Sequence, residues 1–111
     1  KGVGDVGNIV LRDRKHLSEH GLMVVIITID KETNQIVAGP NLISRGFVYV
    51  KESQELMEEC KRVCERSLQR CKEEKIYDWS SLKYHIRTDL RNFLFHETNR
   101  NPMILPIIIE V

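Results

Sequence analysis

The amino-acid sequence predicts a small α+β domain, with a three- to four-stranded sheet and two helices packed on one face of it. The chain has 111 residues, which is enough for one hydrophobic core. Its first half holds β-branched runs separated by turn residues, whereas from Ser53 onward apolar residues recur every three or four positions. A last apolar run, Met103–Val111, returns to a strand-like pattern. The expected order of elements is therefore β-β-β-α-α-β.

The first strand is expected at Leu22–Ile29, a run dominated by β-branched residues. A polar turn follows, and residues 35–38 form a short returning strand, so the two segments predict a hairpin. Residues 39–41, Gly-Pro-Asn, are expected to form a turn before a third strand within Leu42–Val50, clearest at residues 46–50. In the closing strand Pro106 has no N–H to donate, which predicts a bulge or an unpaired side at that position.

The second half of the chain predicts two amphipathic helices. Ser53 fits an N-cap of the first helix, and Asp78 or Ser80 can cap the second. The apolar stripe of the first comprises Leu56, Cys60, Val63, Cys64, Ser67, Leu68 and Cys71, and that of the second Leu82, Ile86, Leu90, Phe93 and Leu94. A shared sheet face is the simplest partner for both stripes. The first and last strands hold more apolar residues than a one-sided sheet uses. Either they are central strands of a small sheet, or their far face meets a neighbouring domain or subunit.

Composition and charge narrow the class of protein. Hydrophobic residues make up 41% and charged residues 30% of the chain, as in ordinary globular domains. A formal net charge of +1 neither requires nor excludes an acidic partner such as RNA. The longest apolar run, Leu22–Ile27, is too short to cross a membrane, so no membrane partner is expected. The three cysteines fall in one predicted helix, which argues against a disulfide framework and favours a reducing compartment.

Three sequence motifs that could indicate a cofactor, metal or redox site have simpler explanations. Residues 2–7 match the GxGxxG dinucleotide pattern, but no strand precedes them, which favours a flexible linker. His16 and His20 have a metal-binding spacing without further ligands obviously placed beside them. The cysteines share an apolar stripe and lack a CxxC pattern, which indicates packing. The sequence therefore assigns no catalytic residue, no metal ligand and no cofactor to this chain.

Basic residues form two stripes. Arg62, Arg66 and Arg70 recur every four residues on the first predicted helix, where a solvated face is the favoured interpretation. The second helix repeats the spacing, with Tyr84 beside the basic residues, and a further arginine lies at the bend before residues 46–50. Because such residues can follow a phosphate backbone, the candidate RNA-binding set is Arg45, Lys83, Arg87 and Arg91. A solvated face competes with this interpretation as well.

Long segments of the chain resemble one known family, ribonuclease J. Gly4–Lys15 and Leu17–Glu19 resemble the junction that follows its catalytic core. Residues 43–50, Ile-Ser-Arg-Gly-Phe-Val-Tyr-Val, and residues 100–108, Arg-Asn-Pro-Met-Ile-Leu-Pro-Ile-Ile, resemble its C-terminal domain. The likeness covers essentially the whole chain. It implies a junction from the upstream core at residues 1–20 and a C-terminal α+β domain at residues 21–111.

The resemblance also implies a function. Ribonuclease J is a cytoplasmic enzyme of RNA processing and decay, which degrades RNA from the 5′ end and also cuts it internally. Its metallo-β-lactamase domain, with a β-CASP insertion, uses two zinc ions whose activated water attacks the phosphodiester. The HxHxDH metal signature of that domain has no counterpart here, so no catalytic or metal residue is carried over. The family's C-terminal domain is a three-stranded sheet facing two helices and is associated with assembly of the oligomer.

Three hypotheses about function follow. The first is an accessory domain that supports homo-oligomer assembly and packing on the upstream core, with RNA met through the parent enzyme. The alternative is an RNA-binding accessory module that uses a basic helix face. The third, an independent enzyme, would need a site that the sequence does not show.

Overall fold

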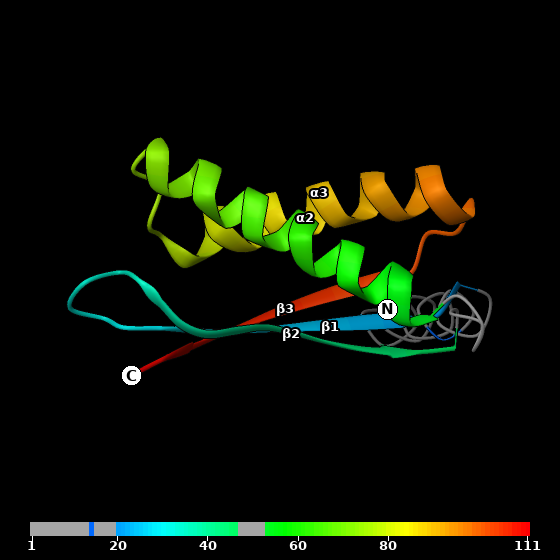
Figure 1. The fold of residues 1–111 in the computed structure, drawn as a ribbon, viewed down its shortest axis with the longest axis horizontal. Helices are drawn as coiled ribbons and strands as arrows, with labels where there is room; N and C mark the ends of the chain where they lie inside the picture. The colour runs from blue at the N-terminus through cyan, green and yellow to red at the C-terminus, as the bar shows by residue number, and fades with distance from the viewer. Residues whose placement is uncertain (1–13, 15–19, 47–52) are drawn as a thin grey trace, which may run out of the picture.

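The computed structural model describes residue 14 and residues 20–46 and 53–111 of the chain. In this part, three strands form one sheet and two helices lie on one side of it, as Figure 1 shows. The elements are β1 (Leu22–Ile29), β2 (Ile36–Arg45), α2 (Ser53–Glu73), α3 (Trp79–Thr98) and β3 (Met103–Glu110). The predicted α+β class, with both helices on one face, is confirmed.

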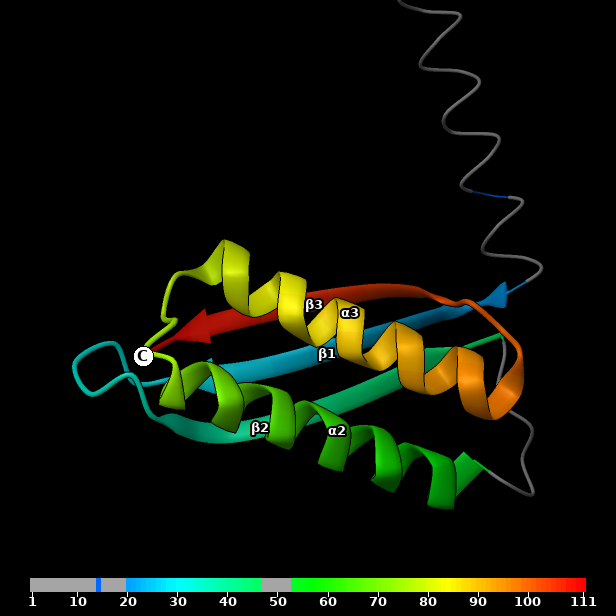
Figure 2. The ribbon, with the colours of Figure 1, turned by 90° about the horizontal axis from the view of Figure 1, so that it is seen from above.

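The central strand of the sheet is β1, in the order β2-β1-β3. β1 pairs antiparallel with β2, which confirms the predicted hairpin, and parallel with β3. The chain crosses from β2 to β3 through both helices. α2 contacts β2 and α3 contacts β3, an arrangement that Figure 2 shows from above. On this one face, α2 therefore lies over the β2 edge and α3 over the β3 edge, and their apolar stripes share one core with β1.

The turn predicted at residues 39–41 is wrong, because these residues lie inside the strand β2. Between the pairs Ile26↔Asn41 and Thr28↔Ala38, two residues of β2 stand opposite one residue of β1, so β2 has one extra residue there and forms a bulge. Gly39 has φ +89°, and a Cβ there would lie 2.6 Å from the carbonyl oxygen of Ile26. Two predicted strands are therefore one bulged strand, and the described elements run β-β-α-α-β. The strand predicted at residues 46–50 lies, apart from Gly46, outside the described residues.

The core forms between the helix stripes and the helix-facing residues of the sheet. Met23, Val25 and Ile27 on β1 are fully buried, as are Ile86, Leu90 and Leu94 on α3. From α2, all three cysteines are buried, which confirms that they pack as small apolar residues: Cys60, Cys64 and Cys71. Full burial of one such Ile or Leu side chain is worth about 1.5–3 kcal/mol, so these side chains dominate the stability of the fold.

The connection between the helices is held at both ends. At the end of α2, Lys75 has φ +59°, and the N–H groups of Ile76 and Lys75 donate to the carbonyls of Cys71 and Lys72. These are the two bonds of a Schellman motif. Asp78 is the N-cap of α3, because its carboxylate accepts a bond from the Ser81 N–H at 3.0 Å. Of the two caps predicted for this helix, Asp78 is the one used. The predicted cap of the first helix, Ser53, is the first residue of α2, and its side chain lies outside the described part.

Pro106 lies in β3 without a bulge, because the pairing of β1 with β3 shows no register shift. At the two ends of β3, the Met103 N–H donates to the carbonyl of Gly21, just before β1, and the Val111 N–H donates to the carbonyl of Ile29, the last residue of β1. Odd-numbered N–H groups therefore point toward β1, and even-numbered ones toward the outer edge. The missing donor of Pro106 falls on that edge and costs no bond within the sheet, so the predicted unpaired side is confirmed.

Candidate functional site

The sheet presents an apolar face on the side opposite to both helices. Alternate residues of each strand point there, and those of β1 are Leu22, Val24 and Ile26. The pairing places Ile43 and Leu105 on either side of Val24. We call this surface the open sheet face; its apolar residues are Leu22, Val24, Ile26, Ile43, Leu105, Ile107 and Ile109.

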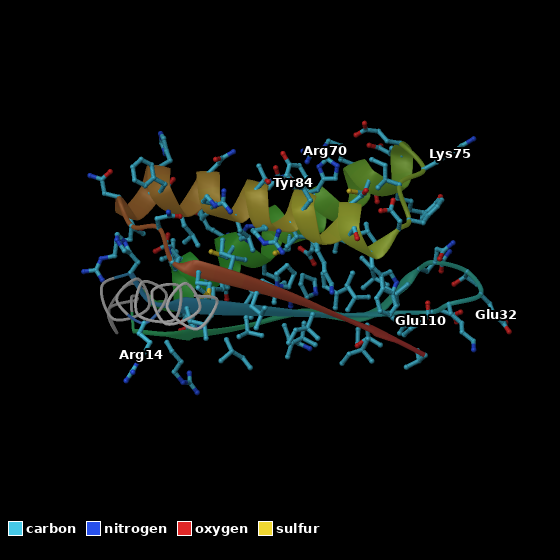
Figure 3. All side chains as sticks on the ribbon, turned by 180° about the vertical axis from the view of Figure 1, so that it is seen from behind. Arg14, Glu32, Arg70, Lys75, Tyr84 and Glu110 are labelled. Atoms are coloured by element: carbon cyan, nitrogen blue, oxygen red, sulfur yellow. The ribbon has the colours of Figure 1, made fainter. Side chains whose placement is uncertain are left out.

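The open sheet face is exposed to an unusual degree for parallel strands. Ile43, Leu105, Ile107 and Ile109 have 43%, 48%, 38% and 46% of their surface exposed. Figure 1 shows that no described helix covers this side of the sheet, and in Figure 3 side chains project from it. Parallel strands such as β1 and β3 are normally covered on both faces. A contiguous apolar patch on a domain surface is typical of a site where another protein surface packs.

The predicted RNA-binding residues do not form one group. Arg45 pairs with Leu22, so it lies on the open sheet face, and its guanidinium donates to the Ser44 carbonyl at 2.8 Å. Lys83, Arg87 and Arg91 lie on α3, in the other layer of the domain. The structure therefore keeps the three basic residues of α3 together and separates Arg45 from them.

Two exposed aromatic rings of α3 lie on the same side of the helix as Arg91: Tyr84, which the sequence already places beside the basic residues, and Phe95, which the sequence analysis did not single out. Tyr84 is 58% and Phe95 55% exposed. Tyr84 precedes Arg91 by seven residues and Phe95 follows it by four, so the three side chains share one side of the helix. The position of Phe95 outside the buried stripe was the signal that could have revealed it; that stripe comprises Leu82, Ile86, Leu90 and Leu94.

The basic stripe of α2 is partly neutralised by carboxylates. Arg62, Arg66 and Arg70 are all exposed. The Arg70 guanidinium lies 2.6 Å from Asp89 on α3 and 3.9 Å from Glu74. One of the three arginines is thus engaged in ion pairs within the domain, which agrees with the favoured interpretation of a solvated face.

The cysteines of α2 have the wrong chemistry for metal binding or redox work. Burial raises the pKa of the Cys60 and Cys64 thiols to about 12, with a smaller contribution from Glu59 at Cys60 and from Cys60 at Cys64. A metal ligand or nucleophile must be a thiolate, so a raised pKa opposes both roles. Within residues 20–46 and 53–111, no three His, Cys, Asp or Glu side chains are grouped so that they could hold a metal ion.

Of the two histidines with metal-binding spacing, the structure describes only His20. His20 accepts a hydrogen bond from the Asn101 N–H at 3.3 Å, a contact between the start of β1 and the turn before β3. This agrees with the interpretation of a structurally bonded histidine. His16 lies outside the described residues.

None of the helices in the part of the chain that the structure describes is long and apolar enough to span a membrane.

The fold and its open face define a small two-layer α+β domain, with three strands on one side and two helices on the other. The model of the ribonuclease J C-terminal domain family matches residues 9–111, and the chain belongs to this family. Ribonuclease J2 of Bacillus subtilis (strain 168) is 47% identical over 110 residues, and ribonuclease J 2 of Staphylococcus aureus (strain NCTC 8325 / PS 47) is 44% identical. Each alignment covers 99% of this chain and 20% of the relative, so the chain spans about a fifth of the relatives' length.

Proposed function

We propose that this chain is an assembly module of a ribonuclease J-like enzyme, and that its open sheet face packs on a second copy of the domain. The single observation that supports the proposal is the uncovered apolar face of a sheet that contains a parallel strand pair. A two-fold axis brings the same patch of two copies together, and an apolar sheet face is complementary to itself. Burying side chains such as Ile107 and Leu105 supplies the free energy of association.

The proposal gives this domain no chemical step. In the parent protein, hydrolysis would lie in an upstream metallo-β-lactamase and β-CASP core with two zinc ions, in the cytoplasm. The described residues do not fit such a centre, because their buried thiols are held protonated and their carboxylates and imidazoles are not grouped. The domain would act on RNA through that core, by holding the assembly in which the core works. The boundary between a junction at residues 1–20 and this domain stays a prediction.

Sedimentation of the 111-residue chain over a range of concentrations tests the proposal. We expect a reversible dimer for the natural sequence and a monomer for Ile107→Lys, because a charge on the open sheet face opposes the burial of that face. Phe95→Lys is the matched control, since Phe95 is similarly exposed but lies on α3. It should leave the dimer unchanged. A chain that stays monomeric at every concentration and also fails to bind the separately produced upstream core would contradict the proposal.

A second candidate function, single-stranded RNA binding, is favoured by one observation. On α3 the exposed rings of Tyr84 and Phe95 flank Arg91, and Lys83 and Arg87 lie on the same helix. Aromatic rings stack on bases while arginines contact phosphates, which is the combination that single-strand binders use.

Fluorescence anisotropy with a labelled oligoribonucleotide tests this candidate. Replacing Lys83, Arg87 and Arg91 with alanine should weaken binding and lower the slope of log affinity against log salt by about 1 for each lost phosphate contact. The matched control replaces Arg62 and Arg66 on α2, which should change neither quantity. Equal affinity for the natural chain and the triple variant would remove RNA binding by α3.

A further inference from the structure

A cavity of about 460 Å³ lies where the β1–β2 turn, the α2–α3 connection and the end of β3 meet. In Figure 3, Glu32, Lys75 and Glu110 mark these three segments at one end of the molecule. The cavity is on the helix side of the sheet, so it is separate from the open sheet face. Its volume is in the range that ligand pockets occupy, roughly 300–1,000 Å³.

The cavity combines an apolar floor with aromatic walls. The buried side chains of Ile29, Leu68 and Leu82 contribute to the floor. Tyr77 and Trp79 line it from the α2–α3 connection, and each keeps 43% of its surface exposed. Rings left so exposed beside a hollow offer their faces to an incoming group.

These aromatic walls are held in place by the ends of the two helices. The Schellman motif fixes the chain at Ile76, immediately before Tyr77, with 2.8 Å between the Ile76 nitrogen and the Cys71 oxygen. The N-cap at Asp78 fixes the chain on the other side, immediately before Trp79. Rings held on a short, doubly anchored connection lose little conformational entropy on binding, which favours a pre-formed site.

The opposite wall is anchored to the sheet. The Asp30 carboxylate accepts bonds from the N–H groups of Glu32 at 2.8 Å and Thr33 at 3.2 Å, and so shapes the β1–β2 turn. The Lys31 N–H donates to the Val111 carbonyl at 3.1 Å, which ties this turn to the end of β3. Pairing of Ile29 with Glu110 then places the Glu110 side chain at the cavity.

The charged groups around the cavity favour a cation. Glu65 from α2 and Glu110 from β3 line it, with Lys72 as the one ammonium among the lining residues. None of the three forms an ion pair with another described residue. Two carboxylates against one ammonium repel a phosphate, which weighs against an RNA backbone at this place.

We propose that this cavity binds an arginine side chain presented by an extended segment of a partner protein. A guanidinium is planar and always charged, stacks on aromatic faces, and donates paired hydrogen bonds to carboxylates. Tyr77 and Trp79 supply the faces, and Glu65 and Glu110 supply the acceptors. The three-carbon stem of the arginine covers the apolar floor. The site does not depend on the assembly role of the open sheet face.

The single tryptophan of the chain makes the test direct, because its indole N–H gives one resonance in a nitrogen-15 NMR spectrum. The probe is the peptide acetyl-Gly-Arg-Gly-Arg-Gly-amide, titrated into the 111-residue chain. We expect a saturable shift of the Trp79 indole signal and none with the peptide in which citrulline, an uncharged isostere, replaces each arginine. Glu65→Gln and Glu110→Gln should each weaken binding about three-fold, as loss of one exposed charge pair does.

Glu97→Gln is the matched control, because Glu97 is an exposed carboxylate near the far end of α3. It should leave the affinity unchanged. Equal binding of the citrulline peptide, or unchanged affinity in both cavity variants, would overturn the proposal. So would the absence of any shift with the arginine peptide, or a shift that appears only with a single-stranded oligoribonucleotide and disappears in Lys72→Gln.

Discussion

The guanidinium of Arg70 on α2 donates a hydrogen bond to the carboxylate of Asp89 on α3, with 2.6 Å between Nη2 and Oδ2. The bond to Asp89 is the main cause that raises the pKa of Arg70 above its ordinary value. The two side chains are 48% and 25% exposed, so water competes for both partners. This ion pair therefore aligns two helices whose attachment depends mainly on their apolar stripes.

We expect Asp89→Asn to lower the free energy of unfolding by less than about 1 kcal/mol, because an exposed ion pair in water is worth little. Urea unfolding at low and high salt measures the effect, which should shrink as salt rises. Arg66→Gln, one turn earlier on α2, is the control and should have no measurable effect. A salt-independent loss of several kcal/mol would mean that the pair behaves as a buried one.

The N-cap of α3 predicts that the stability of the domain depends on pH. The bond from Ser81 lowers the pKa of Asp78 below its ordinary value of 3.8. A carboxylate with a lowered pKa in the folded state stabilises that state above pH 3.8, and this contribution disappears as the pH falls through the folded pKa. The urea midpoint of the natural chain should therefore exceed that of Asp78→Ala at neutral pH and approach it in acid. Asp78→Asn keeps an acceptor without the charge, so its advantage over Asp78→Ala should not vary with pH. A constant difference between the natural chain and Asp78→Ala would contradict this prediction.

The buried thiols predict resistance to alkylation. Burial raises the pKa of Cys60 and Cys64 from the ordinary 9.0 to about 12, so their stabilising contribution is present below pH 9 and is lost as the pH rises toward 12. In the folded chain at about pH 8.5 both cysteines should react with iodoacetamide only as fast as the domain opens. Mass spectrometry with and without urea measures this. Rapid labelling of either thiol in the folded chain would show that α2 does not bury it.

The bulge of β2 predicts that substitution of Gly39 destabilises the domain. Gly39→Ala should lower the free energy of unfolding by about 1–3 kcal/mol, because φ is +89° and the new Cβ would meet the Ile26 carbonyl oxygen. Thermal and urea unfolding measure the change. Ala38→Ser, at an exposed neighbour in the same strand, serves as the control and should be close to neutral. A neutral Gly39→Ala would show that the bulge can relax without cost.

Some elements were predictable because their signal is local. The period of three and four in α2 and α3, the β-branched run of β1, and the cap at Asp78 each depend on residues close together in the sequence. The bulge was not predictable in this way. Gly39 and Pro40 are typical turn residues, and only the pairing of their neighbours Ala38 and Asn41 with β1 keeps them inside a strand.

The candidate sites follow the same division. Lys83, Arg87 and Arg91 were found from their spacing, because one helix face is a local property. Trp79 and Glu110 belong to segments far apart in the sequence, and nothing in either segment indicates that they line one cavity. Arg45 was grouped with α3 on charge alone, whereas strand pairing places it in the other layer.

By itself, the sequence determined the α+β class, both helix stripes, the buried cysteines and the resemblance to the ribonuclease J C-terminal domain. The tertiary structure alone decided the strand order β2-β1-β3, the face of the sheet that no described element covers and the cavity beside Trp79. The physical reason is the distance along the sequence over which each effect acts. Propensity and apolar period act between residues a few positions apart, whereas strand order and cavities depend on which distant segments meet once the helices cover one face.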